Sequence, residues 1–229
     1  VIRENTEGEY TDIGGFHYQG FPQEIAIQTA VFTRHGCERV IRYAFELALT
    51  SGKKKITSIT KSNALGYSML LWDDVFDEIS REYPHITTET LLVDAACMDL
   101  IRRPAEFEVL VASNLFGDIL TDITAMITGS VGLAASGNIN PENRFPSMFE
   151  PVHGSAPDIT GTRSANPIAA ILAAGMMVHY LGHEEAAQDL ENAVIHLLAQ
   201  GETLTPDLGG TASTQEVGTA IRESLEEAQ

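Results

Sequence analysis

The sequence predicts an α/β fold in which the strands of a parallel sheet alternate with covering helices. Between residues 24 and 127, short runs of β-branched and aliphatic residues alternate with longer runs whose apolar residues recur at helical spacing. From residue 129 to 166 the sequence becomes rich in Gly, Pro, Ser and Asn, which is typical of loops that build sites. Alternation of strands and helices indicates a sheet covered by helices.

Each expected element has its own signal in the sequence. Residues 1–3 read as a strand, and further strands are expected at 24–32, 56–60, 88–93 and 108–112. Thr33 is placed to cap a helix that runs to about residue 50, and Gly52 follows the end of that helix. Further helices are expected at 69–81, 95–101, 115–127, 168–181, 184–199 and from about 214. The change of character near residue 128 suggests two parts, 1–128 and 129–229.

The composition indicates a globular protein and argues against some classes of binding partner. The chain has 229 residues, 44% of them hydrophobic, and 14 Lys and Arg against 32 Asp and Glu give a net charge of -18. Such a surface repels phosphate backbones, which argues against a nucleic-acid partner. The longest uncharged apolar run, residues 168–178, is shorter than the ~20 residues that span a bilayer, so we expect no membrane span. Cys37 and Cys97 alone provide no disulfide framework, which suits a reducing cytoplasm.

Two aspartates on one expected helix are candidate metal ligands. Asp118 and Asp122 are four residues apart, so their carboxylates share one face of the helix and offer oxygen ligands to a hard divalent cation. The opposite face is expected to be buried and contains Phe116, Ile119, Leu120, Ile123 and Ile127. Asp94 follows an expected strand and is a third candidate. Taken alone, the pair is more typical of a solvated helix face, and Asp94 is more typical of a helix cap.

Seven motifs in a fixed order resemble the β-decarboxylating dehydrogenases, the isocitrate/isopropylmalate dehydrogenase family. They are RENTEGEY at 3–10, TKSN at 60–63, VDAACM at 93–98, NLFGDILTD at 114–122, FEPVHGSAPD at 149–158, ANP at 165–167 and DLGGTAST at 207–214. The resemblance covers essentially the whole chain. It implies an isopropylmalate dehydrogenase-like two-domain α/β fold, with the first part of the N-terminal segment missing. Residues 1–128 would then form a central dimerisation and catalytic/metal domain, and 129–229 the C-terminal part of a dinucleotide-binding domain.

The resemblance also implies roles for individual residues. Asp118 and Asp122 would bind Mg²⁺ or Mn²⁺ together with Asp94 from the neighbouring subunit, and oxygen-only ligation suits these ions better than zinc. Lys61 would move the proton of the substrate's α-hydroxyl across the dimer interface. Two further residues complete the implied set: Tyr10 would protonate the carbon that loses CO₂, and Arg3 would bind a substrate carboxylate through its planar guanidinium.

The nucleotide site rests on the resemblance, because the chain contains no G-x-G-x-x-G fingerprint. Taken alone, the segment 153–158 also fits an ordinary Gly/Pro turn. By resemblance it binds the adenosine half of NAD, through residues His153, Gly154, Ser155, Ala156 and Asp158. Asn166 would contact adenine, while Glu150 and Asn63 would lie near the nicotinamide. The carboxylate of Asp158 would repel a 2′-phosphate, which favours NAD over NADP.

The implied function is NAD-dependent, divalent-metal-dependent oxidative decarboxylation of a 2-hydroxy dicarboxylic acid by a homodimer with shared active sites. The segments 5–10, 31–34, 42–47 and 111–114 resemble the tartrate/D-malate branch, whereas VDAACM at 93–98 resembles 3-isopropylmalate dehydrogenase. By resemblance, the residues that read the substrate's β-substituent lie in the missing N-terminal part. An alternative of another class is an inactive, dimerising fragment of such an enzyme.

Overall fold

The computed structural model describes residues 1–227, and the chain divides into two compact units, Val1–Thr124 and Ala125–Gln229. The division falls inside helix α4 (Asn114–Ile127), a few residues before the change of sequence character near residue 128. Each unit has its own apolar core. No helix within the described residues combines the length and apolar character needed to cross a membrane.

The first unit is built on a four-stranded sheet whose paired strands all run parallel. The strands follow the order β1 (Ile2–Arg3), β6 (Val109–Ala112), β4 (Lys55–Thr60) and β5 (Thr87–Leu92). Every residue of β6 is buried, as expected for a central strand covered on both faces. The predicted α/β class and the strands near 56–60, 88–93 and 108–112 are therefore confirmed.

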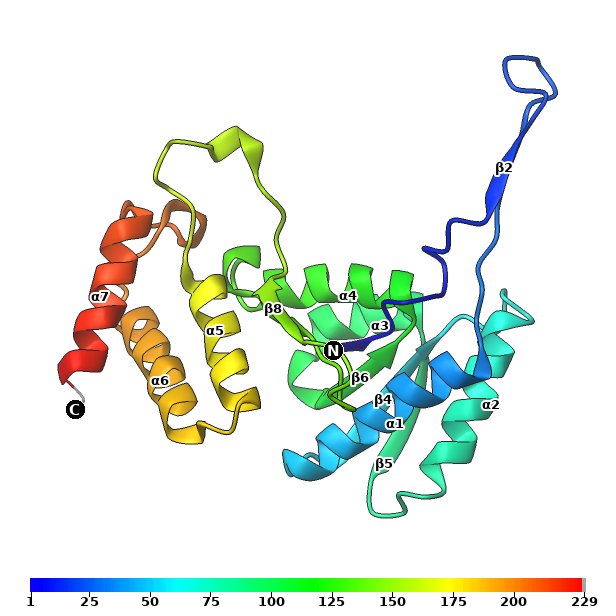
Figure 1. The fold of residues 1–229 in the computed structure, drawn as a ribbon, viewed down its shortest axis with the longest axis horizontal. Coiled ribbons are helices and arrows are strands. Elements are labelled where there is room, and N and C mark those ends of the chain that lie inside the picture. The colour runs from blue at the N-terminus through cyan, green and yellow to red at the C-terminus, as the bar shows by residue number, and fades with distance from the viewer. Residues whose placement is uncertain (228–229) are drawn as a thin grey trace. The chain divides into compact units, whose positions relative to one another are not determined.

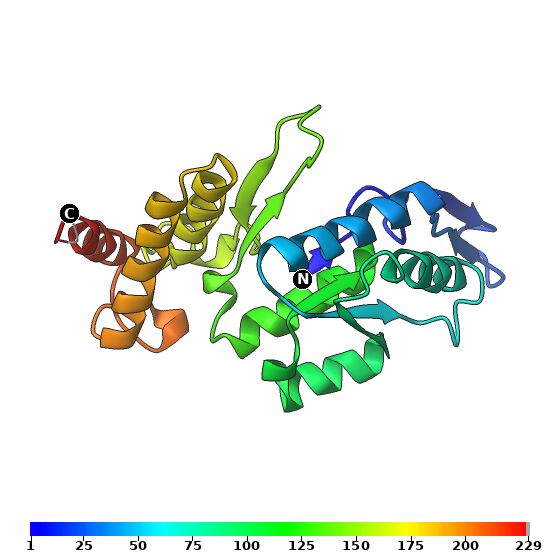
Figure 2. The same cartoon turned by 90° about the horizontal axis from the view of Figure 1, so that it is seen from below.

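Helices cover both faces of this sheet (Figures 1 and 2). The chain leaves β4 through α2 (Ser68–Ser80) to β5, then returns through α3 (Val93–Arg102) to β6 on the other side of β4. Because parallel crossovers are right-handed, this reversal of direction puts α2 and α3 on opposite faces. Helix α1 (Arg34–Thr50) lies beside α2.

The sequence of α1 explains both its start and its packing. Thr33 has extended backbone angles and its hydroxyl accepts a hydrogen bond from the Gly36 N–H, as predicted. One stripe of the helix is buried: Cys37, Val40, Ile41, Ala44, Phe45 and Ala48. The ring of Phe45 stacks on Tyr83 at 4.8 Å between centroids and contacts Phe76 at 5.6 Å. Aromatic packing therefore joins α1 to α2 and to the turn that follows α2.

Only part of the predicted apolar face of α4 is buried. Phe116 and Leu120 are buried, and Ile123 packs against the same core. Ile119 is 42% exposed and Ile127 is 39% exposed, so the expectation that both belong to the buried face was wrong. Ile119 lies at the margin of the stripe, and Ile127 is the last residue of the helix.

A β-hairpin extends from the first unit (Figure 1). Strands β2 (Gly14–His17) and β3 (Ile25–Gln28) pair antiparallel, and a bridge between Gly8 and Val31 closes the base of the hairpin. Every residue of both strands is exposed. The strand expected at 24–32 is thus shorter than predicted, and β2 was not predicted because it has no buried face to impose alternation.

The second unit combines a short hairpin with three helices. The helices α5 (Ile168–Tyr180), α6 (Glu184–Gln200) and α7 (Thr214–Glu227) confirm the prediction, and their core includes Ile168, Val194, Leu197, Val217 and Ile221. Strands β7 (Ala135–Asn138) and β8 (Met148–Pro151) form an antiparallel pair within the segment that was expected to be mostly loop. Short 3₁₀ turns of this unit lie at Val131–Leu133, Pro157–Ile159 and Pro206–Leu208, and the first unit has one at Pro104–Glu106.

The aromatic packing of Phe45 predicts a large loss of stability in the variant Phe45→Ala. The side chain is fully buried, so truncation leaves a cavity that costs about 3–5 kcal/mol. Leu49→Ala on the same helix is the matched control, because Leu49 is 52% exposed and its loss should cost less than about 0.5 kcal/mol. Urea unfolding followed by the fluorescence of Trp72, the chain's one tryptophan, measures both. Equal effects of the two substitutions would contradict the packing.

Candidate active site

The candidate catalytic residues lie where the parallel strands end. Arg3 is the last residue of β1, Lys61 directly follows β4, and Asn114 begins α4 just beyond β6. Asp94 lies in the first turn of α3, directly after β5. Carboxyl ends of parallel strands share one edge of a sheet, which is where α/β proteins build their sites. The strand order puts β1 beside β6 and β4 beside β5, so two separate clusters form.

The first cluster brings together Arg3, Tyr10 and Asp118. The Nη1 of Arg3 donates to Oδ1 of Asp118 at 2.7 Å, and the Tyr10 hydroxyl donates to Oδ2 at 3.0 Å. The guanidinium also lies 5.6 Å from the centroid of the Tyr10 ring. The hydrogen bond to Asp118 raises the pKa of Tyr10 above its ordinary value, because the carboxylate favours the protonated phenol. A cation, a proton donor and a carboxylate therefore meet at one point on the surface.

The close approach of Arg3 to α4 depends on Gly117. A Cβ at this position would lie 2.6 Å from Cγ of Arg3 and 2.8 Å from its Cβ, far inside ordinary contact. The stem of Arg3 therefore crosses α4 where the helix has no side chain, one residue before Asp118. This packing accounts for a glycine in a helix interior, where it costs about 1 kcal/mol relative to alanine.

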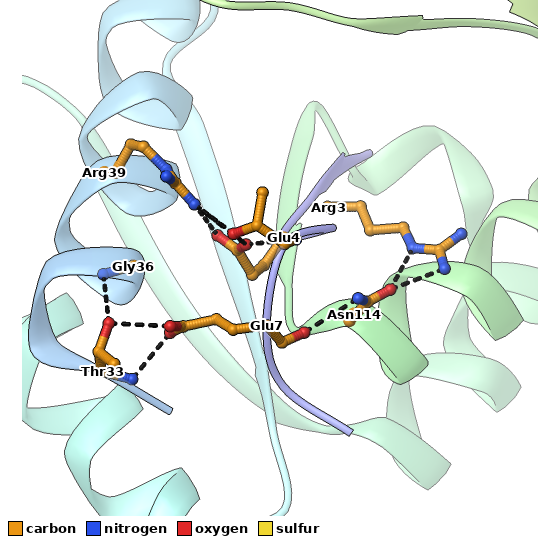
Figure 3. A network of polar contacts seen from close by, with 8 residues as sticks. Arg3, Glu4, Glu7, Thr33, Gly36, Arg39 and Asn114 are labelled. Carbon is orange, nitrogen blue, oxygen red and sulfur yellow. Dashed lines mark hydrogen bonds and ion pairs between the residues drawn. The ribbon is translucent and has the colours of Figure 1, made fainter. Parts of the chain in front are cut away.

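Three glutamates in the segment 3–10 anchor it to the rest of the unit, and Figure 3 shows the contacts of two of them, Glu4 and Glu7. Glu4 is 4% exposed, and its carboxylate accepts hydrogen bonds from Arg39 Nη2 at 3.1 Å and from the Thr6 N–H at 2.7 Å. Glu7 accepts from the N–H and the hydroxyl of Thr33, at 2.8 and 2.9 Å. A buried carboxylate needs such partners. Through them, the segment is tied to both the start and the middle of α1.

Glu9 ties the same segment to α4. Its Oε1 accepts from the Ser113 hydroxyl at 2.7 Å and its Oε2 accepts from the Leu115 N–H at 3.1 Å. A carboxylate at a helix N-terminus satisfies an unpaired N–H and interacts favourably with the helix dipole. Glu9 precedes Tyr10, so this contact also fixes the backbone that presents the phenol. The sequence analysis did not predict these roles for Glu4, Glu7 and Glu9. The presence of three acidic residues within six positions of one motif was the signal that could have indicated them.

The second cluster is the ion pair of Lys61 and Asp94. The Nζ of Lys61 lies 2.6 Å from Oδ1 of Asp94. The Lys61 ammonium, helped by backbone N–H groups, holds the pKa of Asp94 below its ordinary value. The Asp94 carboxylate is 62% exposed, so the pair lies open to solvent. Within the part of the chain that the structure describes, no hydrogen bond or ion pair joins this pair to Arg3, Tyr10 or Asp118.

The predicted metal ligands offer an incomplete set of donors within one chain. Asp118 and the exposed Asp122 lie one turn apart on α4, with carboxylate oxygens that suit Mg²⁺ or Mn²⁺. Asp94 pairs with Lys61 in the other cluster instead. Among residues 1–227, no three His, Cys, Asp or Glu side chains gather closely enough to hold a metal ion. The donor chemistry fits the predicted cation, and a cation bound there would need further ligands from outside this cluster.

The residues predicted to bind the nucleotide are mostly exposed. Glu150 lies on β8, where its carbonyl oxygen accepts from the Ser136 hydroxyl at 2.9 Å. The loop after β8 includes Ala156 in the left-handed region, with φ of 42°, and leaves His153, Gly154, Ser155 and Asp158 at the surface or partly buried. Asn63 lies in the first unit, in the exposed turn after Lys61. Exposed backbone N–H groups in such a loop are suited to a phosphate.

Asn166 differs from the other nucleotide candidates because it is buried. Its Nδ2 donates to Oδ2 of Asp207 at 3.0 Å, and its Oδ1 accepts from the Ile168 N–H at 3.0 Å. The carboxylate of Asp207 also accepts from the Ser130 hydroxyl. Both ends of the Asn166 side chain are therefore engaged inside the unit.

Comparison with known proteins shows the family to which the chain belongs. The sequence model of the isocitrate/isopropylmalate dehydrogenases matches residues 1–221. The chain belongs to this family. It is 46% identical to a tartrate dehydrogenase/decarboxylase of Pseudomonas putida, over 98% of this chain and 63% of the other. It is 48% identical to the decarboxylating D-malate dehydrogenase of Escherichia coli strain K12, over 96% of this chain and 62% of that protein.

The family fold is shown by a solved structure as well. The crystal structure of isocitrate dehydrogenase from Methylococcus capsulatus superposes with a TM-score of 0.91 and 41% sequence identity. The match covers 97% of this chain and 66% of that one. The predicted isopropylmalate dehydrogenase-like fold and the predicted family are thus confirmed. The chain spans a little over three fifths of the curated relatives it matches.

Asp207 predicts a pH-dependent contribution to the stability of the second unit. Burial raises the pKa of this carboxyl, but hydrogen bonds from Ser130 and Asn166 outweigh burial and hold the pKa below its ordinary value of 3.8. A group whose pKa is lowered by folding stabilises the fold above its unfolded pKa and loses that effect as the pH falls through the folded value.

Asp207→Asn should therefore lower the thermal unfolding midpoint at pH 7 by several degrees and flatten its fall between about pH 5 and pH 2. Asp189→Asn, at an exposed aspartate of α6 in the same unit, is the control and should leave both unchanged. Calorimetry across this pH range is the measurement. Parallel pH profiles for the protein and the Asp207 variant would show that the hydrogen bonds do not favour the ionised carboxylate.

Proposed function

We propose that the protein containing this chain catalyses NAD-dependent, divalent-metal-dependent oxidative decarboxylation of a 2-hydroxy dicarboxylic acid. The D-malate/tartrate type of substrate is supported by the two decarboxylating relatives at 46% and 48% identity. The observation that carries the proposal is the meeting of Arg3, Tyr10 and Asp118 at the carboxyl edge of the sheet. A carboxylate-binding cation, a proton donor and a metal ligand are the groups that this reaction needs.

Each residue has a defined task in the proposed reaction. Arg3 binds a substrate carboxylate through its guanidinium. Lys61, in its neutral amine form, would accept the proton of the α-hydroxyl while the hydride on C2 passes to the oxidised nicotinamide, which yields a 2-oxo acid. Loss of CO₂ then leaves an electron pair on the neighbouring carbon, and Tyr10 donates its phenolic proton to that carbon. The Tyr10 hydroxyl already points its proton at an anionic group in this structure.

The cofactors supply the remaining chemistry when bound: NAD accepts the hydride, and Mg²⁺ or Mn²⁺ polarises the substrate's oxygen atoms. Asp118 and Asp122 would hold the cation from one chain. The exposed loop at 153–158 would hold the adenosine half of NAD, with the Asn166 backbone against adenine. Glu150 and Asn63 would lie toward the nicotinamide. The carboxylate of Asp158 in that loop favours NAD over NADP.

A homodimer with shared sites accounts for the two clusters. Lys61 and Asp94 would complete the site that Arg3, Tyr10 and Asp118 begin on a second copy. Large apolar side chains of the first unit that have no cover in one chain support such an assembly. They are exposed on the β2–β3 hairpin and on α3 and α4: Phe16, Tyr18, Phe21, Ile27, Met98, Ile101 and Ile119.

Two other readings make different predictions. A 3-isopropylmalate dehydrogenase is favoured by the motif VDAACM at 93–98, within which Asp94 pairs with Lys61. An inactive dimerising fragment is the alternative of another class, and it would dimerise without producing NADH. Turnover measurements separate all three.

Purified protein should form NADH from NAD and D-malate or tartrate only when Mn²⁺ or Mg²⁺ is present. The panel consists of D-malate, tartrate, 3-isopropylmalate and isocitrate, each with NAD and with NADP. Exclusive turnover of 3-isopropylmalate would move the substrate to that branch. No NADH or NADPH from any of the four acids would rule out the proposed reaction for this protein.

The matched variants Asp118→Asn and Asp74→Asn assign the metal ligand. Asp118→Asn should abolish metal-dependent turnover and weaken Mn²⁺ binding measured by electron paramagnetic resonance, while the oligomer remains intact by size-exclusion chromatography. Asp74, an exposed aspartate of α2, is the control and should tolerate the same change. Unchanged Mn²⁺ affinity in Asp118→Asn would remove that residue from the metal site.

Sharing of the site predicts complementation between two inactive variants. Lys61→Ala and Tyr10→Phe damage different clusters, so a heterodimer of one copy of each has one intact site and one site with both defects. Random mixing gives heterodimers in about half of the dimers, so activity should return to about a quarter of the unsubstituted level. Co-expression with two different affinity tags allows the heterodimer to be isolated and assayed. Heterodimers as inactive as the parents would show that each chain builds its own site.

A further inference from the structure

Asn114 holds the guanidinium of Arg3 by one edge. The side chain is 5% exposed at the start of α4, and its Oδ1 accepts from Nε and Nη2 of Arg3 at 3.1 and 2.8 Å. Its Nδ2 donates to the carbonyl oxygen of Glu7 at 2.9 Å (Figure 3). All three hydrogen bonds go to the segment that also presents Tyr10. The amide is fixed at both ends, which determines the direction in which Arg3 points.

The surroundings of Asn114 pack closely against it. Gly8 has φ of +92°, and a Cβ there would lie 3.2 Å from Cβ of Asn114, so the segment 3–10 packs directly on this side chain. Gly117 accommodates the stem of Arg3 one turn further along α4. Asn114 is therefore packed between the segment it orients and the helix that carries Asp118.

The chemistry of the amide matters as much as its position. A guanidinium has five N–H donors, and the edge formed by Nε and Nη2 is satisfied here by a neutral oxygen. A neutral acceptor orients the group without cancelling its charge. The charge on the Nη1 side, which forms an ion pair with Asp118 in this structure, is therefore not reduced further by residue 114. A carboxylate on the Asn114 edge would form an ion pair, weaken that attraction and repel the carbonyl of Glu7.

We propose that Asn114 is a positioning residue that aims Arg3 at the substrate's carboxylate while adding no negative charge of its own beside the guanidinium. The inference rests on the proposed role of Arg3 as the carboxylate-binding cation. It makes residue 114 a determinant of affinity for the acidic substrate, with little influence on proton transfer or on the nucleotide.

The test uses the full-length protein and the variants Asn114→Ala and Asn114→Asp. Asn114→Ala frees Arg3 from its support, whereas the isosteric Asn114→Asp keeps the shape and adds the compensating charge. Ser58→Ala is the matched control, since it removes a buried hydrogen bond of the same unit, from Trp72 Nε1 at 3.0 Å, away from the strand ends. Steady-state kinetics with the best acid of the panel gives KM and kcat separately.

Both Asn114 variants should raise KM for the acid by about tenfold or more, with the larger effect in Asn114→Asp, and change kcat by less than about threefold. KM for NAD should stay constant. Ser58→Ala should leave KM for the acid unchanged. KM values in both Asn114 variants that match the control would overturn the inference, as would a loss confined to kcat.

A second measurement separates failure of this inference from failure of the proposed function. The Nε–H signal of Arg3 in ¹⁵N-resolved spectra, assigned with Arg3→Lys, should exchange slowly with water and should exchange faster in Asn114→Ala. If the unsubstituted protein oxidises no acid, the proposed function fails, and the Nε–H signal still decides whether Asn114 holds Arg3. Identical exchange in both proteins would overturn the orientation by Asn114 whatever the activity.

Discussion

The parallel pairing of β1 with β6 is the constraint on which the candidate active site depends. Only two residue pairs form this ladder, Ile2 with Val111 and Arg3 with Ala112. The pairing delivers Arg3 to the point where α4 begins, and the contacts with Asn114, Gly117 and Asp118 follow from that position. The order of the remaining strands puts Lys61 and Asp94 in the other cluster. Topology therefore decides which chemical groups one chain can combine.

The negative charge of the segment 3–10 is compensated locally. Its three glutamates each face a positive or proton-donating group: Glu4 faces Arg39, Glu7 faces the first turn of α1, and Glu9 faces the first turn of α4. Helix N-termini and a guanidinium thus compensate the negative charges of the three glutamates, which would otherwise repel an acidic substrate. Arg3 remains the cation of the segment whose outer edge is turned toward a carboxylate. This matters in a chain with a net charge of -18.

The sequence predicted the elements that depend on local patterns, which are helix caps and the spacing of apolar residues. Thr33 and the apolar stripe after it specified α1, and the hydrophobic runs specified β4, β5 and β6. The hairpin β2–β3 was not predicted as a pair of strands. All residues of both strands are exposed in one chain, so the sequence need not alternate between apolar and polar residues there. The strands β7 and β8 lie in a segment whose Gly, Ser, Asn and Pro content resembles that of a loop.

The sequence predicted which residues belong to the candidate site but not how their side chains are arranged in space. Family motifs named Arg3, Tyr10 and Asp118, yet their meeting depends on strand order, which no local pattern encodes. The partners of Asn114 in the segment 3–10 lie 107 and 111 residues away along the chain. These long separations set an order of assembly. The segment 3–10 can make these contacts only after more than a hundred further residues have left the ribosome. Closing so long a loop costs conformational entropy, so we expect the segment to dock late in folding. A chain stalled before α4 is complete would thus contain every residue of the segment 3–10 but could not assemble the cluster of Arg3, Tyr10 and Asp118.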